Sequence, residues 1–130
     1  GPDGVQVGSR FAASIESTAH NNFKETIVNI KEGDTQLTLK ELAPVRLVKN
    51  KFYNDVQALY EKCPSKEDLA ALLGRARAKK GMFEGDLEEG ELEIGQIAGL
   101  IHEILPVEQI VQEMMTDFKA ACQEKSTFEF

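Results

Sequence analysis

The sequence predicts a small, mainly helical α/β chain whose opening strand has no evident partner strands. Its 130 residues, 42% of them hydrophobic, are enough for one modest core. They are too few for a complete (β/α)8 barrel, which needs roughly 200 residues or more. Apolar residues recur at helical spacing over five stretches, whereas only one or two stretches look like strands, the first of them GVQV at the start of the chain.

The first two elements are this strand and a helix. Val5 and Val7 alternate with polar residues before a glycine turn, which indicates a short buried strand. Phe23 and Ile27 then stand at helical spacing, and Gly33 lies where that helix should end. Candidate N-caps for the helix are Ser17, Asn21 and Asn22.

In the middle of the chain, two short stretches have ambiguous secondary structure and are followed by two clear helices. Residues 35–39 alternate polar and apolar side chains and could form a short strand, while residues 45–48 stay open between a strand and the approach to a helix. An apolar stripe predicts a helix from Lys51 to Cys63, closed by a proline. Ser65 then opens the capping-box-like SKED of the next helix.

In the last part of the chain, glycines indicate a loop and a proline indicates where the last helix begins. The acidic stretch MFEGDLEEGELE is expected to be a loop, and a helix is expected over roughly 92–104. Gly95 and Gly99 would lie four apart on that helix, and because glycine costs about 1 kcal/mol there relative to alanine, the pair suggests a tight contact. Pro106 suits the first turn of a last helix with the stripe Val107, Ile110, Val111, Met114, Phe118 and Cys122.

Charge is distributed unevenly, although the net charge is only −7. Residues 1–83 carry 13 basic and 10 acidic side chains (net +3), whereas residues 84–130 carry 2 and 12 (net −10). Nucleic-acid binding needs a basic excess and is therefore not expected; instead, the two parts are expected to face each other. The basic run at residues 75–80 is interpreted as a solvated helix end that complements the helix dipole.

No residue pattern by itself assigns a reaction. Gly8 and Ser9, after the strand, could bring backbone N–H groups close to an anion, although such a glycine is more often only a turn. No nucleophile with its base and no metal-ligand spacing is present. A structural role is expected for the two histidines and the two cysteines, and the cysteines are expected to act as small hydrophobic residues: His20, His102, Cys63 and Cys122.

Two segments read together resemble a known family. DGVQVGSRFAASIESTAHNNFKE resembles the last barrel strand and following helix of the FMN-dependent nitronate monooxygenase (2-nitropropane dioxygenase) family, which includes enoyl-acyl-carrier-protein reductase II. FEGDLEEGELEIGQIAGLIHEI resembles the C-terminal signature of that family, and the resemblance covers about residues 4–123. It implies that the chain is a C-terminal fragment of a (β/α)8 TIM barrel, mainly helical, with the last barrel strand and a helical extension.

The resemblance also implies an organisation and a cofactor site. Residues 1–33 would hold the last strand and its helix, residues 34–91 a helical insertion, and residues 92–130 the C-terminal helices of one incomplete domain. Gln6, Gly8 and Ser9 would lie at the FMN phosphate, in agreement with the general phosphate sites of such barrels. His20 matches a recurrent family position and is interpreted as structural, so no catalytic residue is assigned within this chain.

The implied parent protein is a flavoprotein that oxidises nitronates or nitroalkanes with FMN and oxygen, and the chain alone is expected to be inactive. The alternatives are an enoyl-acyl-carrier-protein reductase II that uses NAD(P)H, and a non-catalytic helical interaction module. The expected partners are a small-molecule substrate and a second copy in a homo-oligomer. With two cysteines, no apolar run of roughly 18 residues and no leader-like N-terminus, a cytoplasmic protein without membrane contact is expected.

Overall fold

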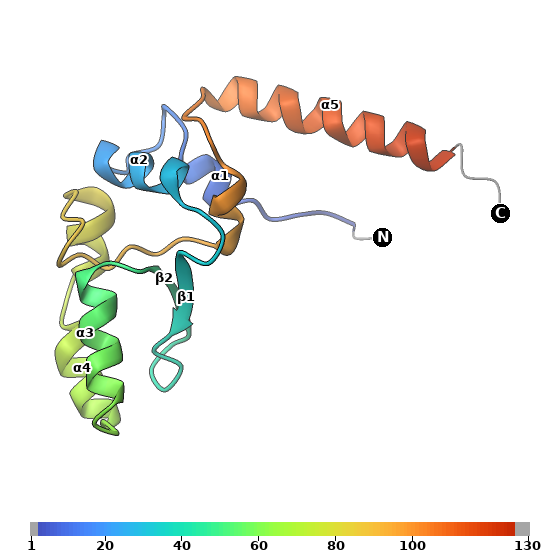
Figure 1. Cartoon of the computed structure of the whole chain (residues 1–130). Coiled ribbons are helices and arrows are strands. Elements are labelled where there is room, and N and C mark those ends of the chain that lie inside the picture. The colour runs from blue at the N-terminus through green and yellow to red at the C-terminus, as the bar shows by residue number, and fades with distance from the viewer. Residues whose placement is uncertain (1–2, 127–130) are drawn as a thin grey trace.

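The computed structural model describes residues 3–126. It has a helical layer (residues 9–12 and 21–29), a two-stranded hairpin (residues 35–48) and, beside the hairpin, a pair of helices (residues 51–60 and 66–73) (Figure 1). Strand β1 (Thr35–Thr38) pairs antiparallel with β2 (Val45–Val48), so that Thr35 lies opposite Val48 and Thr38 opposite Val45. The described residues are thus mainly helical with one small sheet. The elements, in chain order, are α1 (Ser9–Ala12), α2 (Asn21–Asn29), β1 (Thr35–Thr38), β2 (Val45–Val48), α3 (Lys51–Tyr60), α4 (Lys66–Leu73), the π-helical turn η1 (Lys79–Phe83), the 3₁₀ helix η2 (Gln96–Leu100) and α5 (Val107–Ser126).

Side-chain caps define where the three middle helices begin. His20 caps α2, since its Nδ1 accepts the Asn22 N–H at 3.1 Å, so the N-cap is none of the three predicted residues. Asn50 caps α3, and its side-chain amide also donates to carbonyl oxygens of the 87–90 loop. Ser65 begins α4 with the predicted capping box, in which Asp68 replaces the usual Glu or Gln.

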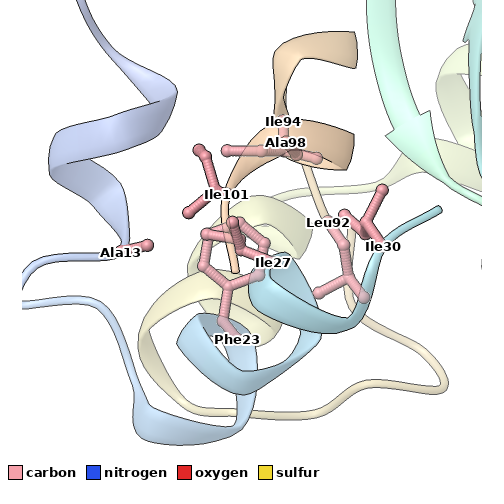
Figure 2. Close-up of a cluster of buried hydrophobic side chains, with 8 residues drawn as sticks. All are labelled: Ala13, Phe23, Ile27, Ile30, Leu92, Ile94, Ala98 and Ile101. Carbon is pink, nitrogen blue, oxygen red and sulfur yellow. The ribbon is translucent and has the colours of Figure 1, made fainter. Parts of the chain in front are cut away.

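One buried cluster joins the helical layer to the C-terminal part of the chain (Figure 2). Phe23 and Ile27 project from α2 toward Ala13, at the end of α1, and toward Ile101, just after η2. All four side chains are 4% exposed or less. The cluster is completed by Ile30, Leu92, Ile94 and Ala98.

A second buried cluster lies between the hairpin and the helix pair. Leu47 from β2 and Phe52 and Val56 from α3 are fully buried, and Leu69 from α4 is 1% exposed. Leu39, just after β1, completes the cluster and has a positive φ of 52°. The amphipathic stripes predicted for α3 and α4 therefore face each other and the hairpin.

The opening segment does not form the predicted buried strand. Residues 4–8 belong to no strand, and Val5 is 82% exposed. A strand needs neighbouring ladder partners for its N–H and C=O groups, and the only strands within residues 3–126 pair with each other. The alternating pattern is present in the sequence, but the described part of the chain supplies no strand to pair with it.

The prediction of a helix over residues 92–104 is wrong for most of that range. Residues 92–94 run extended beside β2: the Val48 N–H donates to the Leu92 carbonyl at 3.0 Å, and the Ile94 N–H donates to the Arg46 carbonyl at 3.2 Å. Only η2 is helical. The free edge of β2 offered hydrogen-bond partners that a sequence window cannot contain, and these outweighed the helical spacing of the isoleucines.

The two parts of the chain meet, as expected, where Lys80 pairs with Asp86 at 3.0 Å. The interpretation of the 75–80 run as a solvated helix end does not hold for Arg77, which is half-buried. Arg77 donates to the Leu72 and Leu73 carbonyls at the end of α4 and to the Glu89 carbonyl, at 3.0, 2.8 and 2.8 Å. Its guanidinium also lies 4.5 Å from the centroid of the Phe52 ring. Arg77 therefore closes α4 and ties the acidic loop to the second cluster.

Helix α5 extends away from the rest of the molecule and exposes much of its apolar stripe (Figure 1). Ile110 near its start is buried, but Val111 and Phe118 are 44% and 63% exposed. Cys122 and Cys63 are both exposed, so the prediction that they act as buried hydrophobic residues is wrong. Cys63 follows the end of α3, and Cys122 lies on a turn of α5 that no other described element covers. No helix of the described chain is both long and apolar enough to cross a membrane.

The exposed stripe of α5 and the exposed Val5 and Val7 predict that the isolated chain self-associates, because unpaired apolar surface and unpaired extended backbone favour association. Sedimentation velocity over a concentration series should give an average mass that rises above 14.4 kDa. Phe118→Glu should shift the distribution back toward the monomer. Ala120→Glu, which adds the same charge about 200° around the helix, should change it much less. A chain that stays monomeric at every concentration would contradict the prediction.

Replacing Arg77 by lysine should destabilise the chain by about 2 kcal/mol, because lysine cannot reproduce three carbonyl contacts and a ring contact from one planar group. The measurement is urea unfolding of the chain followed by circular dichroism. Arg75→Lys is the matched control, since Arg75 is exposed and makes no such contacts with other described residues. Equal effects of the two substitutions would show that the Arg77 contacts add nothing to stability.

Candidate functional site

The predicted phosphate residues lie where the extended N-terminal segment enters α1. Gln6 and Gly8 are exposed and Ser9 is half-buried. Gly8 is the N-cap of α1, and its carbonyl accepts the Ala12 N–H at 3.0 Å. The N–H groups of Gly8 and Ser9 donate to no other residue within 3–126, so they are available to an acceptor from outside this part of the chain.

Nothing in the described part of the chain requires a glycine at position 8. Its φ of −109° is open to any residue. A Cβ built on Gly8 would meet no other atom within 4 Å. The space that a side chain would fill is therefore open, and a ligand can approach the backbone there closely.

The Ser9 hydroxyl is held by a residue 86 positions away. Its Oγ accepts the Gly95 N–H at 3.2 Å, which joins the two segments that carried the family resemblance. The sequence predicts a tight contact of Gly95 and Gly99 with a helix or a ligand. The contact is present at Gly95, whereas Gly99 has only ordinary van der Waals neighbours, the nearest of them the Glu32 nitrogen at 3.6 Å.

Two hollows open on either side of Gly8 and Ser9. One, of about 710 Å³, reaches toward α5 and has Glu113 and Asp117 on its wall. The other, of about 410 Å³, reaches toward the hairpin and is bordered by Arg46. The arrangement supplies backbone donors, a hydroxyl and room on both sides, which suits a phosphate group carried by a larger ligand. This donor set is compatible with the phosphate of FMN, and the assignment of Gln6, Gly8 and Ser9 to that phosphate stays a prediction.

His20 has a structural role, as expected. Besides capping α2, its imidazole lies directly against Gly85, whose φ is +79°. A Cβ on Gly85 would lie 2.6 Å from the His20 Cε1 atom, so the glycine is required by this contact as well as by its backbone angle. The His20 ring thus caps α2 and packs against Gly85 of the acidic loop.

Glu91 is the described carboxyl with the most perturbed environment. Its side chain is 7% exposed beside a hollow of about 310 Å³ that lies between the β1–β2 loop and the end of α4. Burial and, to a smaller extent, the charge of Glu93 raise the pKa of the Glu91 carboxyl to about 7, while Arg77 acts in the opposite direction. The sequence carried no signal for this, because burial depends on the chain path around residue 91.

Asn50 and Arg77 are structural residues that sequence reasoning missed or described only in part. Asn50 stands directly before a clear apolar stripe, and the usual N-cap preference could have identified it. Nothing in the sequence distinguishes Arg77 from the neighbouring Arg75. Only the folded chain shows which arginine reaches the carbonyl oxygens.

The fold and the site together define a mainly helical chain with exposed backbone donors where its N-terminal segment enters α1. A family model for nitronate monooxygenases matches residues 1–117. The chain belongs to the nitronate monooxygenase family.

Two solved structures of FabK from Thermotoga maritima, one of them a mutant, are similar to this chain. Their sequences are 34% and 35% identical to that of this chain, and the TM-score is 0.78 for each. The similarity covers 95% and 92% of this chain but only 37% and 38% of those two chains. The chain therefore corresponds to somewhat more than a third of each of these relatives.

Glu91 should give stability a distinctive pH dependence. Because its folded-state pKa is raised from 4.5 to about 7, its protonation stabilises the fold fully below about pH 4.5, and this contribution is lost as the pH rises through 7. Glu91→Gln should therefore gain stability relative to the unmodified chain between pH 5 and 8, by at most about 3 kcal/mol. Urea unfolding at several pH values measures this.

The matched control for Glu91 is Glu25→Gln, at an exposed position of α2. The difference between this variant and the unmodified chain should stay nearly constant over the same pH range. A constant difference for Glu91→Gln as well would contradict the raised pKa.

Proposed function

We propose that this chain is the C-terminal part of an FMN-dependent oxidoreductase with a (β/α)8 barrel. Residues 1–33 would contribute the last strand and its helix, residues 34–91 the helical insertion, and residues 92–130 the C-terminal helices. The observation that carries the proposal is the donor set at Gly8 and Ser9, in the segment that resembles the phosphate-binding strand of the family. The exposed and unpaired residues 4–8 are then the strand that the remaining barrel would receive.

The contribution of this chain is to bind and orient the cofactor. The Gly8 and Ser9 N–H groups and the Ser9 hydroxyl would donate to the FMN phosphate, and Gln6 would lie beside it. Bound FMN supplies the electron-accepting chemistry. The catalytic base is not among the residues of this chain, so the chain alone is expected to be inactive.

For the substrate, we propose nitronates or nitroalkanes, which the parent protein would oxidise with FMN and oxygen. Membership of the nitronate monooxygenase family supports this choice. It also makes a stand-alone helical interaction module the weaker hypothesis. The few cysteines, both free and exposed, suit a reducing compartment, and we propose a cytoplasmic homo-oligomer.

A second candidate is an enoyl-acyl-carrier-protein reductase II, which would pass hydride from NAD(P)H through FMN to an enoyl thioester. The specific observation in its favour is the 34% to 35% identity with FabK over nearly the whole of this chain. The two candidates use the same phosphate site and differ in substrate and in electron donor.

Two assays on the full-length protein that contains this chain separate these candidates. We expect oxygen uptake with a nitronate and no need for NADH. The second candidate predicts NADH consumption with a crotonyl thioester and little oxygen uptake. The same protein stripped of its flavin is the control and should be inactive in both assays. A full-length protein that neither binds FMN nor turns over either substrate would contradict the proposed function.

A further inference from the structure

The Ser9 hydroxyl accepts a hydrogen bond from the Gly95 N–H and can still form further hydrogen bonds. A hydroxyl has one hydrogen to donate and two lone pairs to accept with. Gly95 uses one lone pair. The hydroxyl hydrogen has no acceptor among the hydrogen bonds of residues 3–126, so it is free to donate to a group outside this part of the chain.

Position 95 requires glycine because a side chain would collide with a neighbouring atom, and not because of its backbone angles. Its φ and ψ are −68° and 154°, an extended conformation that any residue adopts. A Cβ on Gly95, however, would lie 2.9 Å from the Ser9 Oγ. An alanine at this position must therefore displace either the backbone of residue 95 or the Ser9 hydroxyl.

The backbone of residue 95 is the more firmly held of the two. Just before it, the Ile94 N–H donates to the Arg46 carbonyl, and the Ile94 side chain is 7% exposed. Just after it, the Gly95 carbonyl accepts the N–H of Ala98, which is fully buried. Ser9 can yield by rotating one side-chain bond. An alanine at position 95 should therefore move the hydroxyl and leave the fold nearly unchanged.

We propose that Gly95 is a positioning residue for the phosphate of the flavin: it holds the Ser9 hydroxyl so that its hydrogen points to the phosphate-binding position. This inference rests on the proposed function. It gives the glycine of the GQIAG stretch a role through Ser9, at the far end of the sequence. It also links the hairpin to the phosphate site, because β2 holds the segment that ends at Gly95.

The test compares FMN with riboflavin, which lacks the phosphate, on the full-length protein. Dissociation constants come from quenching of flavin fluorescence. Gly95→Ala should weaken FMN binding about tenfold, in keeping with the loss of one hydrogen bond to a charged group, and should leave riboflavin binding unchanged. Gly99→Ala is the matched control: its Cβ would have ordinary contacts only, and neither ligand should be affected.

A double variant shows whether Gly95 acts through Ser9. Ser9→Ala should weaken FMN binding by a similar factor, and adding Gly95→Ala to it should weaken binding no further, because the hydroxyl is already gone. Thermal melts of the apo-proteins should show similar midpoints for Gly95→Ala and the unmodified protein. A larger loss of FMN affinity in the double variant, or a parallel loss of riboflavin binding, would overturn the positioning role.

The outcomes separate this inference from the proposed function. If the unmodified protein binds no FMN, or binds FMN and riboflavin equally, the proposed phosphate site is wrong and the inference fails with it. If the unmodified protein prefers FMN and Gly95→Ala keeps the same preference, the phosphate site stands and only the role of Gly95 is overturned.

Discussion

The structure depends most on the extended segment from Leu92 to Gly95, which lies along the free edge of β2. Two backbone hydrogen bonds hold it there, from the Val48 N–H and the Ile94 N–H. Leu92 and Ile94 point into the cluster of the helical layer, while β2 contributes Leu47 to the cluster of the helix pair. The segment thus connects both clusters, and a shift in its register would turn its two apolar side chains away from the helical layer.

The acidic loop, which directly precedes this segment in the chain, is held in place by side-chain donors. Asn50 donates to the carbonyl oxygens of Leu87 and Gly90, and Arg77 donates to that of Glu89. Gly90 allows the loop to close, because a Cβ there would collide with the backbone of Gly81. This loop leads directly into the Leu92–Gly95 segment. Its closure therefore determines where that segment begins, and indirectly where Gly95 meets Ser9.

How well the sequence predicted each element depended on where its stabilising partners lie. The start of α4 was predicted correctly because the Ser65–Asp68 capping box is complete within four residues. The helix over 92–104 was predicted wrongly because its competitor, the edge of β2, lies more than 40 residues away in the chain. For the candidate site, Gly8 and Ser9 were predicted from a local pattern and a resemblance, and their role stays a prediction. The hydrogen bond from Gly95 was not predicted, because it joins residues 86 positions apart.

The sequence by itself determined the amphipathic stripes of α3 and α4 and the capping box that begins α4. These follow from spacing and residue type within short windows, whereas the family was indicated by the resemblance of two segments. The tertiary structure decided which backbone edge the 92–95 segment joins, that Arg77 and not Arg75 closes α4, and that Glu91 is buried. It also decided that residues 4–8 stay unpaired. Each of these depends on groups that are distant in the chain, and only folding determines whether such groups meet.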